Sequence, residues 1–187
     1  MELPVDRFKR FLPLPVTLIT TMDAQKIANA APYSCVMPIL RPLNLIALAS
    51  ALPRDTLRNI RENGEFVINV MGRPGFRQAL QCARSYPPEI DELAEVGLET
   101  VPAKKVAPPR VRQAVGWIEA VLDKEVTGEN YVLIIGRVLC AEINDLYWQD
   151  DTLQEAPIVM LSPELFSLGD NLFDQGIMAQ VGPELKY

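Results

Sequence analysis

The chain has 187 residues, of which 49% are hydrophobic and 22% are charged, and its net charge is −6. This length lies within the usual range of about 100 to 200 residues for one domain, so we expect residues 1–187 to form a single domain. The acidic balance gives no general attraction for nucleic acid or anionic lipid, no apolar run approaches the roughly 20 residues that span a bilayer, and neither end resembles a signal peptide.

The chain contains no histidine and three cysteines, Cys35, Cys82 and Cys140. Histidine is the usual general base near neutral pH and the commonest transition-metal ligand, so Ser-His and Cys-His hydrolases and metal-dependent hydrolases are disfavoured. The cysteines are widely spaced and form no CxxC pair, which indicates reduced thiols in the cytoplasm. We expect no metal site and no catalytic thiol. An enzyme of this composition would take its chemistry from an organic cofactor.

The first part of the chain predicts a hairpin. Residues 1–15 show no hydrophobic period and are expected to be a loop that covers a surface. The β-branched run Val16–Met22 predicts a strand, and a polar turn leads into a return strand that begins at Ile27. This second strand continues through small residues and a proline at positions 29–34, where proline favours a strand edge and small side chains let another group approach the backbone. Residues 29–34 therefore form either an irregular edge strand or a surface for a flat ligand.

The next segment predicts a strand, a turn, a short helix and another strand. The apolar run from Leu45 to Ala49 predicts a buried strand that stops at Ser50. After a turn that contains proline, Asp55 is expected to cap a helix, and Gly64 is expected to end it in the left-handed conformation.

The start of this helix has the composition of an anion site. A helix N-terminus carries unpaired backbone N–H groups and a partial positive charge. Ser50, Arg54 and Thr56 surround that end, so the turn could bind a phosphate group. Many short surface helices begin in a similar way, and these residues alone leave both interpretations open.

Several linked motifs occur in one order along this part of the chain. They are Asn29-x-Ala31-Pro32-x-Ser34, a strand that ends at Ser50, the turn Arg54-Asp55-Thr56, and Gly64-Glu65-Phe66-Val67-x-Asn69. In this combination the chain resembles the flavin reductase-like family, the FMN-binding split-barrel proteins that include flavoredoxins. The resemblance is dense over residues 15–70 and looser over residues 97–144.

The resemblance implies a mainly β fold, a split β-barrel with added helices of the Greek-key antiparallel, FMN-binding type. It also implies a homodimer that binds FMN, with the flavin ring against residues 29–34 and the phosphate at the turn of residues 50–56. The cofactor-binding residues that it implies are Asn29, Ala30, Ala31, Pro32, Tyr33, Ser34, Ala49, Ser50, Arg54, Asp55, Thr56 and Asn130.

The second half of the chain is expected to contain more strand than helix. Short helices are expected at Phe76–Ala83 and Ile90–Val96. Residues 100–112, rich in proline and basic side chains, are either a positive rim over a phosphate or nicotinamide nucleotide or a solvated basic loop. The runs Gln113–Val126 and Tyr131–Asn144 predict a long hairpin.

A last strand is expected at Pro157–Leu161, followed by a tail, residues 162–187, that is mainly loop with one short helical piece. The strands do not alternate with helices as βαβ units, which favours a closed antiparallel barrel over a doubly wound parallel sheet.

One position departs from the pattern of the family. Many members carry Gly-Asp-His at the hairpin before the last long strand, with the histidine near the place where nicotinamide meets the flavin. The matching residues are Gly128, Glu129 and Asn130. Asn130 can form hydrogen bonds but carries no charge at neutral pH.

The resemblance therefore implies an FMN-binding oxidoreductase of the flavin reductase or flavoredoxin type, which transfers hydride or electrons between its flavin and NAD(P)H or a redox partner protein. One alternative is a flavin-binding electron shuttle or carrier that has no NAD(P)H turnover of its own. Another is an interaction module without a cofactor.

Overall fold

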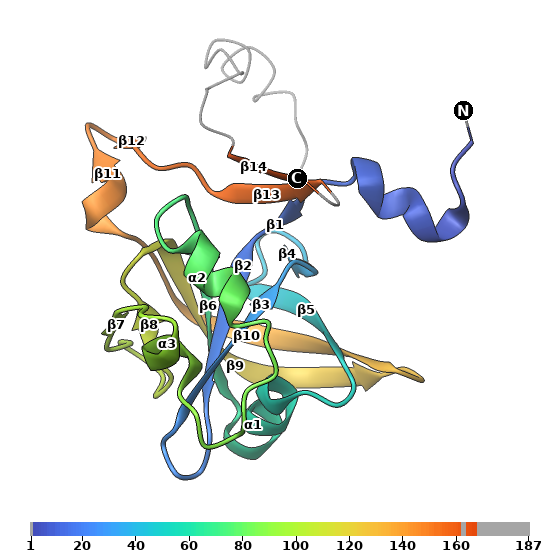
Figure 1. Ribbon diagram of the computed structural model, residues 1–187, viewed down its shortest axis with the longest axis horizontal. Coiled ribbons are helices and arrows are strands. Elements are labelled where there is room, and N and C mark those ends of the chain that lie inside the picture. Colours follow the sequence, from blue (N-terminus) through green and yellow to red (C-terminus); the bar gives the residue numbers. More distant parts are fainter. Residues whose placement is uncertain (1, 162–163, 168–187) are drawn as a thin grey trace.

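The computed structural model describes residues 2–161 and 164–167, and a curled antiparallel sheet dominates this part of the chain (Figure 1). The sheet has seven strands in the order β3–β2–β6–β9–β10–β5–β4. Their bounds are β2 (Thr17–Met22), β3 (Ala28–Tyr33), β4 (Val36–Pro38), β5 (Leu45–Ala51), β6 (Glu65–Met71), β9 (Ala114–Thr127) and β10 (Tyr131–Ile143). The prediction of a mainly β, antiparallel fold is confirmed, but among the described residues the curled sheet keeps two open edges, so the expected closure of the barrel is wrong. β3 and β4 are the two edge strands of this sheet, and the chain crosses from one edge to the other between them.

Helices and short strands surround the sheet. The helical segments are η1 (Val5–Phe11), α1 (Asp55–Asn63), α2 (Phe76–Gln81), α3 (Glu92–Glu95) and η2 (Asp145–Tyr147). The short strands are β1 (Leu14–Pro15), β7 (Thr100–Val101), β8 (Arg110–Val111), β11 (Trp148–Gln149), β12 (Thr152–Leu153), β13 (Ile158–Leu161) and β14 (Glu164–Ser167). Among the described residues, no helix is both long and apolar enough to cross a membrane.

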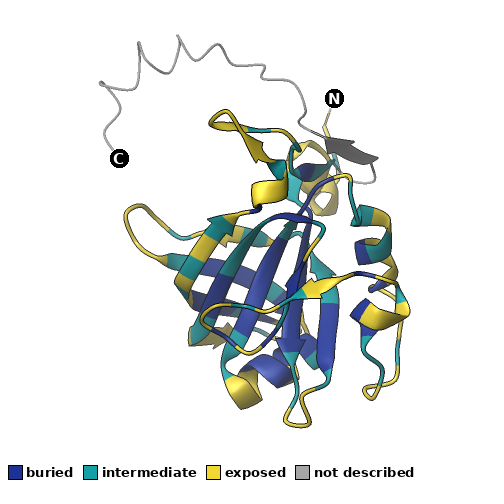
Figure 2. Cartoon of the chain, turned by 90° about the vertical axis from the view of Figure 1, so that its left-hand side faces the viewer, coloured by how far each residue is buried: buried dark blue, intermediate teal, exposed yellow. Residues whose placement is uncertain are grey.

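The central strands of the sheet consist largely of buried residues, drawn dark blue in Figure 2, and these residues form two separate hydrophobic clusters. Consecutive side chains of a strand point to opposite faces. In β2, Leu18 accordingly joins a cluster with Leu93 of α3, while Ile19 joins a second cluster with Ile60 of α1 and Phe66 of β6. The central strands therefore hold α1 against one cluster and α3 against the other.

Two glycines permit this packing. Gly64 is the C-cap of α1 and has a φ of 75°, a left-handed conformation that glycine adopts at little cost. The prediction that Gly64 ends this helix in the left-handed conformation is confirmed. Gly136 lies at a register shift between β9 and β10. A Cβ atom there would lie 2.4 Å from Cζ of Phe66, so glycine lets this buried ring lie against β10.

Three local predictions need correction. Asp55 does not cap α1, because it is already the first helical residue and its carboxylate instead pairs with Arg58 at 2.7 Å; Arg54 holds the N-cap position without a side-chain hydrogen bond. The expected loop of residues 1–15 contains η1 and β1. In the expected C-terminal loop, Glu164–Ser167 forms a strand that pairs with β13. The helical piece expected in that tail lies outside the described residues.

Candidate functional site

A cleft of about 670 Å³ lies between strand β3, the start of α1 and the segment that joins α2 to α3. It brings together two parts of the chain that the sequence motifs marked, residues 29–34 and residues 53–56. Every predicted cofactor-binding residue lines this cleft except Ser50 and Asn130. The lining residues from the prediction are Asn29, Ala30, Ala31, Pro32, Tyr33, Ser34, Ala49, Arg54, Asp55 and Thr56.

The edge strand β3 provides one wall of the cleft. Ala30 and Ala31 present small side chains, and Pro32 lies in the edge strand, where it interrupts no second ladder. Among the strands that the structure describes, only β2 pairs with β3, so one side of the β3 backbone is not paired within the sheet. On that side the N–H of Ala30 donates to Oε2 of Glu92 at 2.9 Å, which ties α3 to the strand.

The polar residues at the turn after β5 differ in exposure: Ser50 and Thr56 are buried, whereas Arg54 is exposed. Ser50 is 1% exposed and does not line the cleft, because its hydroxyl is hydrogen-bonded to the Tyr33 hydroxyl at 2.9 Å. Arg54 is exposed, and its Nη1 donates to the carbonyl of Pro53 at 3.3 Å. Thr56, in the first turn of α1, is buried below the cleft surface with its hydroxyl 3.1 Å from the side-chain amide of Asn29.

Positive side chains gather around the cleft although the chain as a whole is acidic. Arg54, Arg58 and Arg84 all line it. Arg58 is neutralised in part by its ion pair with Asp55. The arginines therefore place positive charge at the cleft within a chain whose net charge is −6.

Several lining residues were not found from the sequence: Cys35, Arg58, Cys82, Ala83, Arg84, Ser85, Tyr86 and Glu92. The most informative of them is Glu92, which is 9% exposed. Its contact with Ala30 joins residues that are 62 positions apart, so no local pattern could indicate it. The sequence shows only that the Glu92 carboxylate lies next to the apolar Leu93 in a short helical segment, which does not identify Glu92 as a residue of the cleft.

Glu92 also affects a neighbouring cysteine. Burial raises the pKa of the Cys82 thiol to about 12, and the negative charge of Glu92 adds to the effect. A thiol with this pKa is almost entirely protonated at neutral pH and is a poor nucleophile. Cys35 lines the cleft and is exposed, and Cys140 is partly buried. In the described part of the chain, no group of three or more potential ligands could hold a metal ion.

Asn130 lies beside the cleft rather than in it. It belongs to the exposed turn between β9 and β10, and its carbonyl accepts a hydrogen bond from the N–H of Leu52 at 3.3 Å. The next residue, Tyr131, pairs with Ala51, which lines the cleft. The turn that departs from the family pattern therefore flanks the candidate site.

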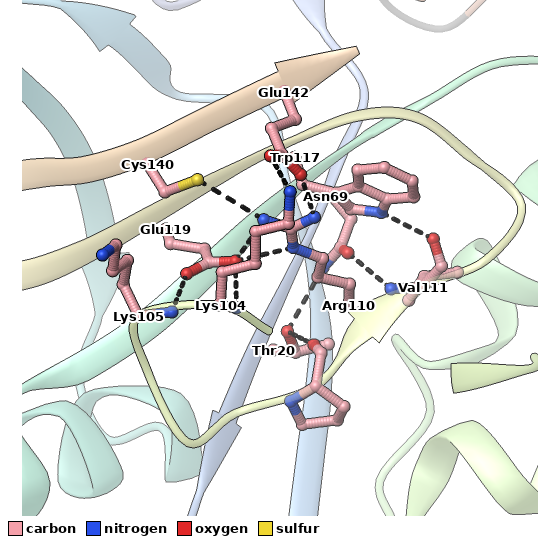
Figure 3. Close-up of polar contacts among 11 residues, drawn as sticks. Thr20, Asn69, Lys104, Lys105, Arg110, Val111, Trp117, Glu119, Cys140 and Glu142 are labelled. Carbon is pink, nitrogen blue, oxygen red and sulfur yellow. Dashed lines mark hydrogen bonds and ion pairs between the residues drawn. The ribbon is translucent and has the colours of Figure 1, made fainter. Parts of the chain in front are cut away.

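Buried charges anchor the basic segment of residues 100–112 (Figure 3). The segment lines no part of the cleft. Arg110 is 4% exposed, and its Nε donates to Oε1 of the fully buried Glu119 at 2.6 Å. Glu119 also accepts from the backbone N–H groups of Lys104 and Lys105, at 2.8 and 2.6 Å. Glu142 forms ion pairs with both Arg110 and Lys104. The segment is thus neither a rim over the cleft nor a freely solvated loop.

Solved structures with the same architecture share the split-barrel fold. Flavoredoxin of Desulfovibrio vulgaris (Miyazaki F) matches with a TM-score of 0.81 at 22% identity, covering 93% of this chain and 97% of that chain. A Shewanella frigidimarina protein described as a flavin reductase with a split barrel domain matches with a TM-score of 0.79 at 20% identity, covering 92% of each chain. These likenesses confirm the predicted fold class.

The sequence comparisons establish the family. A model of the flavin reductase like domain matches residues 8–157, so the chain belongs to this family. A protein of Methanothermobacter thermautotrophicus without an assigned function is 42% identical over 147 residues, which cover 75% of this chain and 69% of the relative. Bacillus subtilis YwrF is 29% identical over 144 residues, which cover 72% and 70% of the two chains. The family predicted from the linked motifs is confirmed.

Proposed function

We propose that the cleft binds FMN and that the protein is an oxidoreductase of the flavin reductase or flavoredoxin type. The observation that carries this proposal is the shape and charge of the cleft, which combines a wall of small residues at β3 with arginines around the start of α1. Its volume of about 670 Å³ lies within the common range for small-molecule sites, about 300 to 1,000 Å³. Membership of the flavin reductase like family supports a flavin as the occupant.

The residues that line the cleft suit both the isoalloxazine ring and the phosphate of FMN. The flat apolar ring would lie against Asn29–Ser34 and Ala49, where Ala30 and Ala31 leave room and the outward backbone of β3 offers hydrogen-bonding groups. The phosphate would be held by Arg54, Asp55 and Thr56 at the first turn of α1, through the arginine charge, backbone N–H groups and the threonine hydroxyl.

Two predicted residues take supporting roles in this proposal. Ser50 would not contact the flavin itself but would hold the Tyr33 hydroxyl in place through their hydrogen bond. Asn130 would lie beside the cleft, where its carbonyl accepts from the N–H of Leu52. Bound FMN would supply the group that accepts and releases hydride or electrons. The chain itself would bind the ring, orient it and set the charge around it.

The phosphate assignment predicts a selective defect in Arg54→Ala. A charge-assisted contact to a phosphate is worth about 1.5 to 3 kcal/mol, so this variant should bind FMN roughly tenfold more weakly or worse. Riboflavin has no phosphate and should bind both proteins alike. Fluorescence titration of the flavin-free protein with each ligand measures both affinities.

Arg77→Ala is the matched control, because Arg77 is also an exposed arginine but does not line the cleft. It should leave the affinity for FMN unchanged. An equal loss of FMN and riboflavin in Arg54→Ala would contradict the phosphate assignment. A protein that stays colourless and binds no flavin would contradict the proposed function and favour an interaction module.

A second candidate function is a flavin-binding electron shuttle or carrier that is reduced by a partner protein rather than by NAD(P)H. The specific observation in its favour is that Asn130 occupies the turn beside the cleft, in a chain with no histidine. No side chain in that turn can therefore carry the charge of an imidazolium.

We further propose that residues 1–187 form one domain that acts as a homodimer in the cytoplasm. Support for the dimer comes from η1, which has no buried residue and exposes Val5, Phe8 and Phe11 at 91%, 49% and 70%. Light scattering should give the mass of a dimer, and Phe8→Glu combined with Phe11→Glu should shift it toward the monomer. A monomer that binds FMN tightly would contradict this proposal.

A further inference from the structure

Beneath the cleft, a chain of buried polar side chains joins Glu92 to Thr56 through Asn29. Glu92 comes from α3, Asn29 from β3 and Thr56 from α1, and their exposed fractions are 9%, 9% and 1%. The side-chain amide of Asn29 lies between Oε1 of Glu92, at 3.3 Å, and the hydroxyl of Thr56, at 3.1 Å. Within the described residues, Glu92 has no ion pair with a basic side chain.

A half-turn of the Asn29 side-chain amide exchanges its nitrogen and oxygen, so the same geometry permits two orientations with opposite hydrogen bonds. In the first, its nitrogen donates to Oε1 of Glu92 and its oxygen accepts from the hydroxyls of Thr56 and Thr21. In the second, its nitrogen donates to those two hydroxyls and its oxygen faces Glu92. A carboxylate can only accept hydrogen bonds, whereas a carboxylic acid can donate one. The second orientation therefore requires protonated Glu92, and the first is the only one of the two that ionised Glu92 can satisfy.

The two orientations leave different atoms of Thr56 free for a ligand. With ionised Glu92, the hydroxyl proton of Thr56 is donated to Asn29. With protonated Glu92, Asn29 donates to Thr56, so the hydroxyl proton is free to be donated to an anion such as a phosphate. Oε2 of Glu92 accepts from the N–H of Ala30 in both cases.

We propose that Glu92 is a positioning residue that acts through Asn29 on Thr56, so that protonation of Glu92 turns the Thr56 hydroxyl into a donor for the phosphate of the ligand. This inference rests on the proposed function, because it assigns the phosphate of FMN to Thr56. It adds a coupling: binding of the phosphate at Thr56 favours uptake of a proton at Glu92, which lines the same cleft.

The surroundings of Glu92 place its titration above the usual range of a carboxyl group. Burial is the largest cause that raises the pKa of Glu92, and the negative charges of Asp55 on α1 and Asp91 beside α3 raise it further. The N–H of Ala30 on β3 acts in the opposite direction. Cys82, after α2, stays protonated and adds no charge, and Arg54, Arg58 and Arg84 line the same cleft.

Glu92→Gln isolates the proposed relay, because the glutamine amide can accept from Ala30 and donate to Asn29 at every pH. It should hold Asn29 and Thr56 in the orientation that suits an anion. Glu95→Gln is the matched control, since Glu95 lies on the same helix but is exposed and does not line the cleft.

The relay itself can be tested on the flavin-free protein by NMR. As pH is raised, the side-chain amide signals of Asn29 should shift with the same midpoint as the carboxyl carbon of Glu92. The shift should be absent in Glu92→Gln and retained in Glu95→Gln. Asn29 signals that do not follow Glu92 would overturn the inference, whatever the protein binds.

Ligand affinity tests the consequence. The dissociation constant of FMN should rise about tenfold as Glu92 ionises, the size expected for one charge-assisted hydrogen bond. FMN carries its own phosphate titration near pH 6, so the comparison is with Glu92→Gln, which should show that titration alone. Riboflavin should show no step that depends on Glu92.

Two further outcomes would count against the proposal. The same pH step for riboflavin would show that Glu92 acts on the ring and would overturn the relay to Thr56. If neither ligand bound to any variant at any pH, both the proposed function and the predicted effect of Glu92 on ligand affinity would be wrong. The NMR titration would still decide whether Glu92 controls Asn29.

Discussion

Arg110→Ala should lower the free energy of unfolding by about 3 to 5 kcal/mol, because it leaves a buried carboxylate without its partner. Glu119 has no exposed surface, and among the described residues it keeps only the backbone N–H groups of Lys104 and Lys105 as donors once the guanidinium is removed. The same substitution removes the ring contact with Trp117, whose centroid lies 5.0 Å from the guanidinium carbon of Arg110. Urea denaturation followed by circular dichroism measures the loss.

Arg112→Ala is the control for this variant. Arg112 pairs with Glu99 at 3.0 Å, but both side chains are more than half exposed, at 51% and 68%. An exposed pair of this kind contributes less than about 1 kcal/mol. If Arg110→Ala fails to fold, Arg110→Lys, which keeps the charge but loses the planar fork, should give an intermediate loss. A loss below about 1 kcal/mol in both Arg110 variants would show that the buried cluster does not anchor residues 100–112.

Reduction of the bound flavin by NADH or NADPH should be slow. A positioned general acid or base accelerates proton transfer by about 10² to 10⁴, and Asn130, at the position of the family's histidine, cannot act as one. Reduction by dithionite or by a partner protein should proceed normally. Anaerobic stopped-flow mixing of the FMN-loaded protein with each nucleotide measures the rate, which should show no step of a histidine near pH 6.5.

Two variants make this test specific. Asn130→His should accelerate reduction by at least one nucleotide and introduce a pH step, whereas Glu129→His places the same ring one residue away and should do neither. Any step beyond the titration of the FMN phosphate should vanish in Glu92→Gln, since the pKa of Glu92, a carboxyl group that lines the cleft, is raised. Fast bleaching of the unmodified protein by NADH or NADPH would refute the shuttle and identify an ordinary reductase.

The sequence alone determined those secondary-structure elements that depend on residues close together in the chain. The β-branched run at β2, the left-handed glycine after α1 and the two long runs of β9 and β10 each follow from backbone preference and hydrophobic period. The linked motifs around Asn29 and Arg54 were also readable, because each lies within a few residues. They gave the family and most of the lining of the cleft on the two sides that β3 and α1 form.

Only the tertiary structure decided the third side of the cleft and the protonation chemistry below it. Glu92 meets Ala30 across 62 positions, and Arg110 meets Glu142 across 32, so their neighbours depend on how the sheet curls rather than on nearby residues. Ser50 shows the reverse case, a motif residue whose hydroxyl is directed by the fold to Tyr33 instead of the cleft. Burial and long-range pairing set the charge of such groups, and neither property is contained in a local run of sequence.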